Sequence, residues 1–177
     1  MQSELKSKRL ILIQSDVSHA SDLFSFWTDP EVSKFMNMES LSTQDEVIDM
    51  IEFTNQLAAL NQSIRYTVFL KESHQIIGSC GFNYIDFGNE RAEIGYDLGK
   101  EYWGKGFAFE AVSALMNYWF HELGLNRLEA RVVPENLRSI RLLNNLGFHF
   151  EGILRQSEKS NGGFIDVMVY SRLKTDR

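Results

Sequence analysis

The sequence predicts an α/β protein of the α+β type, with a mixed, mostly antiparallel central sheet of six to seven strands and about four helices packed on it. The first observation is that three strand-like segments follow one another without an intervening helix, at 64–70, 75–85 and 92–98. The second is that a long helical segment, 107–123, comes next, and the later strands alternate with helices. A fully parallel sheet requires a crossover after every strand, so consecutive strands indicate antiparallel pairing.

The N-terminal part of the chain predicts one strand followed by two helices. Residues 9–13 are branched and apolar, as is typical of a short strand. Residues 18–28 carry apolar side chains at helical spacing. A second helix is expected over 43–60, where Thr43 can serve as the N-cap and Glu46, three residues later, completes a capping box.

The C-terminal part of the chain is divided by glycine and proline. Gly124 is expected to end helix 107–123, because glycine commonly follows a helix C-terminus. Pro134 ends the next strand, since proline has no N–H for the ladder. Asn161, Gly162 and Gly163 predict a turn between the last two strands. The elements expected here are strands 127–133, 148–155 and 164–173, and helix 135–146 before Gly147.

Composition limits the classes of function. The chain of 177 residues has no linker-like or repetitive stretch, so we expect a single domain over 1–177. A formal net charge of −6 argues against a nucleic-acid partner. No apolar run is long enough for a membrane span, the polar residues 1–8 lead us to expect no secretory signal, and the single cysteine, Cys80, suits a reducing compartment. These features predict a cytoplasmic protein without a membrane partner. The four histidines show no metal-ligand spacing, so no metal is expected.

The segment 96–109 places a strand, a glycine-bearing loop and a helix start in that order. Backbone N–H groups at a helix N-terminus lack partners within the helix and attract phosphate oxygens. Gly104 and Gly106 let a ligand approach the backbone, and Lys105 adds a positive charge. The nucleoside-triphosphate loop is absent, and the dinucleotide fingerprint is incomplete because Phe109 stands at its last position. A loop that only enters a helix remains the alternative.

The stretch from Trp103 to Ala108 resembles the acetyl-CoA loop of the GCN5-related N-acetyltransferase (GNAT) superfamily, written R/Q-x-x-G-x-G/A. Trp103 replaces the usual first residue, as in the branch that acetylates the N-termini of ribosomal proteins (RimJ/RimL type). The segments 93–96 and 136–148 resemble that family's fourth strand and its next helix and strand. Thr28 to Val32 resembles the exit of its first helix, so the likeness covers nearly the whole chain.

The resemblance implies the family fold, in which the fourth and fifth strands splay apart into a V that holds the pantetheine of acetyl-CoA. It implies that the Leu98 backbone pairs with pantetheine amides, that the Tyr96 N–H polarises the thioester carbonyl, and that the Asn136 side chain bonds the pantetheine or phosphate arm. The implied cofactor-binding residues are Tyr96, Leu98, Trp103, Gly104, Lys105, Gly106, Phe107, Ala108, Asn136, Ser139 and Arg141, with Arg138 as a further candidate for the 3′-phosphate.

The implied reaction is direct attack of a primary amine on the thioester, which requires a base, an oxyanion donor and a proton for the sulfur. The resemblance implies Glu158, nineteen residues after Ser139, as the base and Ser139 as the proton donor. Many relatives use a tyrosine four residues beyond that serine, where this chain has Leu143. Glu93 is a second candidate for the base and Glu129 a weaker third; each could instead be a solvated or structural carboxylate.

The acceptor stays open at this stage. The branch implies the N-terminal α-amine of a protein, whose pKa near 8 needs only a weak base. The alternatives are a small amine (a polyamine, an aminoglycoside or an amino-acid derivative) and a module that binds CoA without turnover. A homo-oligomer is also left open.

Overall fold

The computed structural model describes residues 1–36, 41–160 and 162–176, and in them the chain forms one sheet of eight strands. The strand order is β1-β2-β3-β4-β5-β6-β8-β7, and the pairing is antiparallel at every step except β5 with β6. The strands are β1 (Glu4–Lys6), β2 (Leu10–Gln14), β3 (Ile64–Leu70), β4 (Ile76–Asp86), β5 (Arg91–Leu98), β6 (Arg127–Val132), β7 (His149–Ser160) and β8 (Gly163–Leu173).

Five α-helices cover the sheet within the described residues, and none is long and apolar enough to cross a bilayer. They are α1 (Ala20–Trp27), α2 (Pro30–Ser33), α3 (Gln44–Ala59), α4 (Phe107–Asn117) and α5 (Leu137–Asn145). Three short turns are η1 (Val17–His19), η2 (Lys100–Tyr102) and the π-helical η3 (Tyr118–Glu122).

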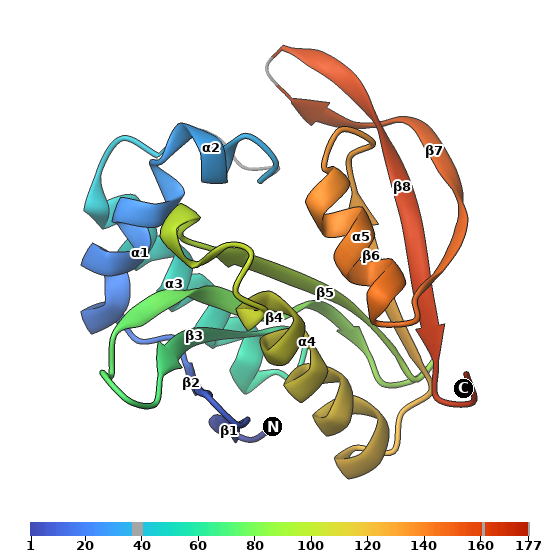
Figure 1. Ribbon diagram of the computed structural model, residues 1–177, viewed down its shortest axis with the longest axis horizontal. Helices are drawn as coiled ribbons and strands as arrows, with labels where there is room; N and C mark the ends of the chain where they lie inside the picture. The colour runs from blue at the N-terminus through green and yellow to red at the C-terminus, as the bar shows by residue number, and fades with distance from the viewer. Residues whose placement is uncertain (37–40, 161, 177) are drawn as a thin grey trace.

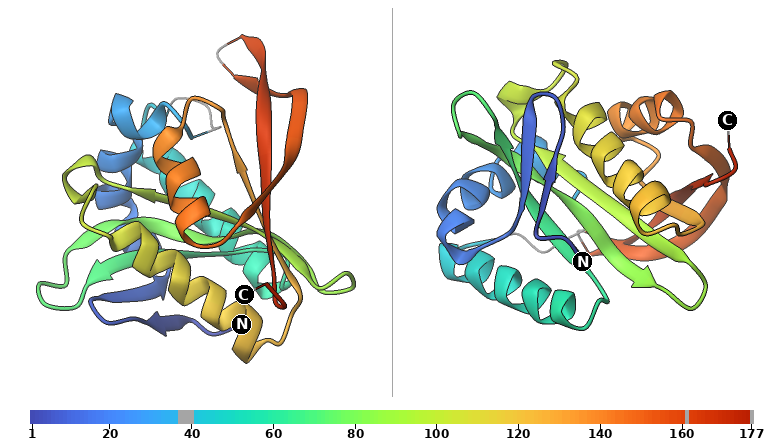
Figure 2. Two further views of the ribbon diagram at one scale, coloured as in Figure 1. Left: turned by 45° about the vertical axis from the view of Figure 1, so that its right-hand side comes forward. Right: turned by 90° about the horizontal axis from the view of Figure 1, so that it is seen from below.

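The helices lie on both faces of the sheet, which Figures 1 and 2 show from three directions. Successive residues of β3 take part in two separate apolar clusters: Val68 packs in the cluster that includes α4, and Phe69 against the cluster built by α1 and α3. Because side chains alternate across a strand, α4 and the α1–α3 pair must cover opposite faces. The α5 helix packs beside β6.

The predicted fold class is confirmed, with an eighth strand and a fifth helix beyond the expected numbers. The unpredicted strand β1 pairs with β2 in the register Leu5↔Leu12. Thr43 and Glu46 form the expected reciprocal capping box at the start of α3. The turn expected at Asn161 lies at a residue outside the described ones, and its neighbours Ser160 and Gly163 pair across the hairpin.

The helix expected over 107–123 changes character at Tyr118, where the wider turn η3 begins. Tyr118, Trp119 and Phe120 are all buried there. A π-helical turn rotates less per residue than an α-helical one, so it can direct consecutive side chains toward one core.

The strands β5 and β6 diverge, and this opening positions the site. Their pairing runs from Arg91↔Arg127 to Ile94↔Ala130. Beyond that point β5 continues to Leu98 against β4, while β6 continues to Val132 against β8. Figure 1 shows the sheet parting between β5 and the arm made of β6, β8, β7 and α5. This is the V that the sequence implies between the fourth and fifth of its expected strands.

Candidate active site

The loop between β5 and α4 exposes a helix N-terminus. Gly106 is the N-cap of α4 in the left-handed conformation, with φ 78°, and Gly104 has φ 73°. Both glycines are exposed, as is Lys105 between them, and a Cβ on Gly104 would meet no atom within 4 Å. The amides of Phe107 and Ala108 begin the helix behind this open loop. The donors, the positive end of the helix dipole and the room for a ligand therefore coincide, as a diphosphate requires.

Arg9 fixes the back of this loop, and the sequence did not single it out. Its Nη1 donates to the Lys105 carbonyl at 3.1 Å, and its guanidinium stacks over the Phe107 ring at 4.4 Å. Its Nε pairs with Glu110 at 2.7 Å, on the first turn of α4. No local motif could have indicated this contact, because Arg9 and Lys105 are 96 residues apart.

Replacing Gly106 by Val is expected to weaken coenzyme A binding about ten- to hundredfold, measured by calorimetry. A β-branched residue disfavours a positive φ by about 1–2 kcal/mol, and its side chain would stand where the phosphate approaches. The exposed Gly162, which has φ 79° in the β7–β8 turn, offers a matched control with the same strain away from the loop. Equal losses in Gly106→Val and Gly162→Val would contradict a role for the loop in binding.

The free edge of β5 faces the opening. Gly99 N–H donates to the Ile77 carbonyl of β4 at 3.0 Å. Because backbone groups alternate along a strand, the N–H groups of Leu98 and Tyr96 point the other way, into the splay. The Leu98 carbonyl accepts from the Trp103 indole Nε1 at 2.8 Å, which fixes the aromatic ring beside the loop.

The start of α5 forms the opposite side of the opening. The Asn136 side chain caps this helix by accepting from the Ser139 N–H at 3.1 Å. The Ser139 hydroxyl lies 2.6 Å from the Tyr96 phenol across the splay. Burial raises the pKa of Tyr96 to about 12, so the phenol keeps its proton at neutral pH. Leu143 is fully buried in the core, and the phenol beside Ser139 is that of Tyr96 on β5.

The two arginines of α5 that the sequence singled out are placed differently. The Arg138 guanidinium stacks over the Trp103 ring at 4.2 Å and so joins the start of α5 to the glycine loop. Arg141 is exposed on the following turn.

A pocket of about 530 Å³ adjoins the splay and extends to the α1 and α3 side of the sheet. Its apolar wall comes mainly from these helices, and its polar wall comes from the strands. The apolar lining includes Trp27, Phe35, Met36, Met50, Ile51, Phe53 and Leu57; the polar lining includes Ser15, Ser63, Arg65, Asn83, Glu93, Asp97, Arg131, Asn136, Ser139 and Glu158.

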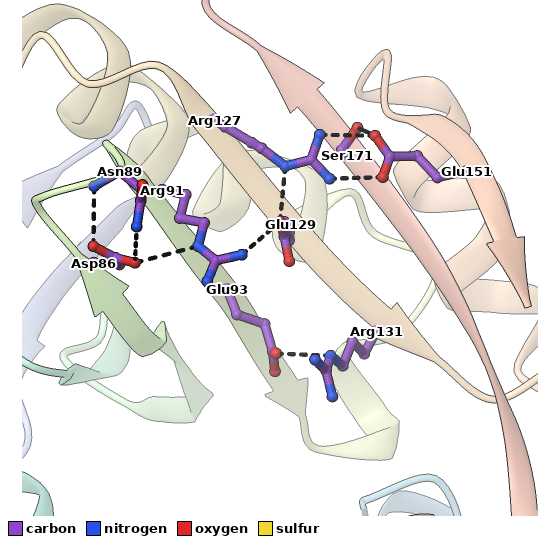
Figure 3. A network of polar contacts seen from close by, with 9 residues as sticks. All are labelled: Asp86, Asn89, Arg91, Glu93, Arg127, Glu129, Arg131, Glu151 and Ser171. Atoms are coloured by element: carbon purple, nitrogen blue, oxygen red, sulfur yellow. Dashed lines mark hydrogen bonds and ion pairs between the residues drawn. The ribbon is translucent and has the colours of Figure 1, made fainter. Parts of the chain in front are cut away.

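Two of the predicted carboxylates meet at this polar wall. Arg131 Nε lies 3.1 Å from Glu93 Oε2, and Arg131 Nη1 lies 3.8 Å from Glu158 Oε1. Figure 3 shows Glu93 and Arg131 pointing toward each other from β5 and β6. Burial raises the pKa of Glu93 above its ordinary value, while the Asn83 hydrogen bond and the Arg131 charge oppose the rise. A half-buried carboxylate of raised pKa is a suitable general base.

A bulge in β7 aims Glu158 at the pocket. The register with β8 shifts between Leu154 and Glu158, and Gln156 inside the bulge has φ 50°. The Gln156 N–H donates to Asp166 Oδ1 at 2.8 Å, which holds the bulge in place. Bulges commonly redirect side chains near active sites.

A buried polar cluster lies next to the carboxylates, and the sequence did not predict it. Asp97, between Tyr96 and Leu98, accepts from Trp27 Nε1 at 2.8 Å and from the Ser79 hydroxyl at 2.6 Å, and it pairs with Arg65. Asn83 accepts from Arg65 Nη1 and donates to Glu93 Oε1, each at 3.3 Å. A continuous polar seam therefore leads from α1 to the two carboxylates.

Other candidates lie apart from this site. Glu129, the weakest candidate for the base, pairs with Arg127 at 2.7 Å and is absent from the pocket lining (Figure 3). Cys80 is fully buried, which raises the pKa of its thiol to about 12. Among the described residues, no cluster of three His, Cys, Asp or Glu side chains could hold a metal ion.

The open edge of β5 and the exposed N-terminus of α4 suit a ligand with an extended arm and a diphosphate, which is what an acyltransferase with a thioester-bearing nucleotide must bind. The chain belongs to the GNAT acetyltransferase family, because the family model described as "Acetyltransferase (GNAT) domain" matches residues 9–149. The protein is accordingly an acetyl-CoA-dependent N-acetyltransferase.

Relatives support this membership. The chain is 48% identical to "Uncharacterized N-acetyltransferase p20" of Bacillus licheniformis, over 97% of each chain. It is 33% identical to the ribosomal-protein-serine acetyltransferase of Escherichia coli, over 56% of this chain and 55% of the other. In fold it is similar to a RimL ribosomal L7/L12 α-N-protein acetyltransferase in complex with coenzyme A, with a TM-score of 0.88, 23% identity, and coverage of 96% and 97%.

Proposed function

We propose that this chain, acting as a single domain in the cytoplasm, transfers the acetyl group of acetyl-CoA to the N-terminal α-amine of a protein. The observation that carries the proposal is the pocket beside the splay, whose polar wall brings Glu93 and Glu158 together around Arg131. A weak carboxylate base suits an α-amine, because roughly a tenth of such amines are already neutral at pH 7. The 33% identity with a ribosomal-protein-serine acetyltransferase supports the choice of acceptor.

In this proposal acetyl-CoA lies along β5. The amides from Gly104 to Ala108 hold the diphosphate at the start of α4, with Lys105 adding charge. The outward-facing backbone of Leu98 pairs with the pantetheine amides, and the Asn136 amide nitrogen donates to the same arm. Arg138 and Arg141 of α5 are the candidates to meet the 3′-phosphate.

The chemical steps use groups that the fold brings to one place. Glu158 takes a proton from the acceptor ammonium, directly or through water, and Glu93 is the alternative base. The neutral nitrogen attacks the thioester carbon, and the Tyr96 N–H stabilises the oxyanion that forms. When the tetrahedral intermediate collapses, the C–S bond breaks and the Ser139 hydroxyl protonates the departing thiolate. The Tyr96 phenol, 2.6 Å from Ser139, returns a proton to the serine and is reprotonated through water by the second proton that the nitrogen loses as the amide forms. The first proton, held by Glu158, then leaves to solvent.

Mass spectrometry tests the acceptor. Purified protein and acetyl-CoA are incubated with matched peptides that carry either a free N-terminal serine or alanine, or a blocked N-terminus and one lysine. We expect a gain of one acetyl group on the free N-termini and none on lysine. A polyamine, an aminoglycoside and an amino-acid amide form the small-molecule arm. Acetylation confined to that arm would overturn the proposed acceptor, and no transfer to any amine would overturn the catalytic role.

A further inference from the structure

The Arg131 guanidinium stands between two carboxylates that come from opposite arms of the V. Glu93 belongs to β5, Arg131 to β6 and Glu158 to β7. The distances are 3.1 Å from Arg131 Nε to Glu93 Oε2 and 3.8 Å from Arg131 Nη1 to Glu158 Oε1. One cation is therefore shared by both candidate bases.

The splay itself puts Arg131 in this position. The pairing of β5 with β6 ends at Ile94 and Ala130, so Arg131 is the first residue of β6 beyond the last paired position. The side chains of Arg127, Glu129 and Arg131 project from the same face of the sheet, because alternate residues of a strand share a face. Arg127 and Glu129 pair with each other at 2.7 Å, whereas Arg131 reaches across the opening to the pocket.

Among the described residues around Glu93, Arg131 is the cation that pairs with its carboxylate. From β4, Asn83 donates a neutral hydrogen bond at 3.3 Å, and the charge of Arg65 on β3 is directed to Asp97. Glu129 of β6 and Glu158 of β7 are acidic, and both raise the pKa of Glu93. The α3 residues that line the pocket are uncharged: Met50, Ile51, Phe53, Thr54 and Leu57.

We propose that Arg131 is a positioning residue that holds Glu93 and Glu158 close together and keeps Glu93 ionised at neutral pH, so that the pair is ready to take a proton from an ammonium acceptor. The catalytic part of this statement rests on the proposed function. Two carboxylates that share a half-buried site repel each other, and one of them takes up a proton unless a cation compensates. With Arg131 present, Glu93 can stay ionised beside Glu158, and the pair can accept the proton that the attacking amine must lose.

The sign of the effect follows from the charges. An adjacent cation lowers a carboxyl pKa, so removal of the Arg131 charge must raise the pKa of Glu93. An opposite charge shifts a carboxyl pKa by about one to three units, and solvent screening of this partly exposed pair favours the lower end. We expect an upward shift of about one pH unit in Arg131→Gln.

Carbon-13 NMR titration of the side-chain carboxyls in the whole chain measures this shift without any acceptor. The two resonances are assigned by their loss in Glu93→Gln and in Glu158→Gln. Arg131→Gln is expected to raise the titration midpoint of Glu93, whereas Arg131→Lys keeps it near its wild-type value. Arg91→Gln is the matched control, because Arg91 projects from the same sheet face but pairs with Asp86 and Glu129.

A second design separates charge from folding. Arg131→Cys is alkylated after folding, either with an aminoethyl group that restores the cation or with a neutral carboxamidomethyl group. Cys80 is fully buried and is expected not to react. A higher titration midpoint of Glu93 in the neutral adduct than in the cationic adduct supports the proposal. Unmoved or lowered midpoints in both the neutral adduct and Arg131→Gln overturn it.

The kinetic readout addresses catalysis separately. With an amine that the protein acetylates, kcat/KM is measured against pH. In Arg131→Gln the acidic limb of this profile should move to higher pH by the shift that NMR measures, and activity should recover at high pH. A uniform loss at every pH, with the limb unmoved, would mark Arg131 as merely structural. If wild-type protein acetylates no amine, the proposed function fails, while the NMR result still decides the ionisation of the pair.

Discussion

Replacing Glu158 by Gln is expected to lower kcat/KM for amine acetylation about 10²- to 10⁴-fold, the usual contribution of a positioned general base. Glutamine keeps the shape and polarity of the side chain but cannot take the proton of the attacking amine. The affinity for coenzyme A should stay unchanged, because Glu158 lies on β7 and the diphosphate loop lies between β5 and α4. Steady-state kinetics with a thiol-release assay measure the rate, and calorimetry measures the affinity.

Glu129→Gln is the control for this experiment, since Glu129 occupies the same sheet face but pairs with Arg127 away from the pocket. It should retain most of the wild-type rate. Unchanged turnover in Glu158→Gln would remove Glu158 from the mechanism. A large loss in Glu93→Gln instead would transfer the role to Glu93.

Replacing Asp97 by Ala is expected to lower the free energy of unfolding by about 3 kcal/mol, because it breaks a buried ion pair from one side. The side chain of Asp97 is 4% exposed and that of Arg65 is 19% exposed. Without the carboxylate, the Trp27 indole N–H and the Ser79 hydroxyl lose their acceptor, and the Arg65 guanidinium loses its only anionic partner among the described residues. Denaturant unfolding measures the free energy. The melting temperature should fall by about 6–12 °C for a chain of this size.

Asp86→Ala provides the comparison, since Asp86 pairs with the half-exposed Arg91 at the far end of the same strand pair. That change should cost less than about 1 kcal/mol. Similar losses for Asp86→Ala and Asp97→Ala would show that the buried cluster contributes no more than a surface pair.

Much of the fold could be predicted because its signals are local. The strand 64–70 has the bounds of β3, and the helix that starts after Thr43 is set by a capping box spanning four residues. By contrast, β1 has a single buried side chain, Leu5, and no periodicity can be recognised in three residues. The π-helical turn at Tyr118 depends on three adjacent aromatic side chains reaching the same core, which no helical pattern predicts.

The residues of the candidate site also fall into those with a local sequence signal and those without one. The glycine loop could be identified because its residues are consecutive, and the structure places it at the start of α4 as expected. Arg9, Arg65 and Arg131 could not be identified, because each acts through partners on other strands or on a distant helix. Their neighbours depend on strand register, on the divergence of β5 from β6 and on the bulge in β7.

The short pairing of β5 with β6 divides the sheet into two arms that meet at this pairing. Only four residue pairs join the two strands, from Arg91↔Arg127 to Ile94↔Ala130. The arm that contains β5 carries the Tyr96 phenol, and the arm that contains β6 carries Ser139 on α5. A small rotation about this pairing changes the separation of these two hydroxyls more than it changes anything near Glu129. The separation of these two hydroxyls therefore depends on how stiffly the four paired positions of β5 and β6, and the ion pairs beside them, hold the two arms together.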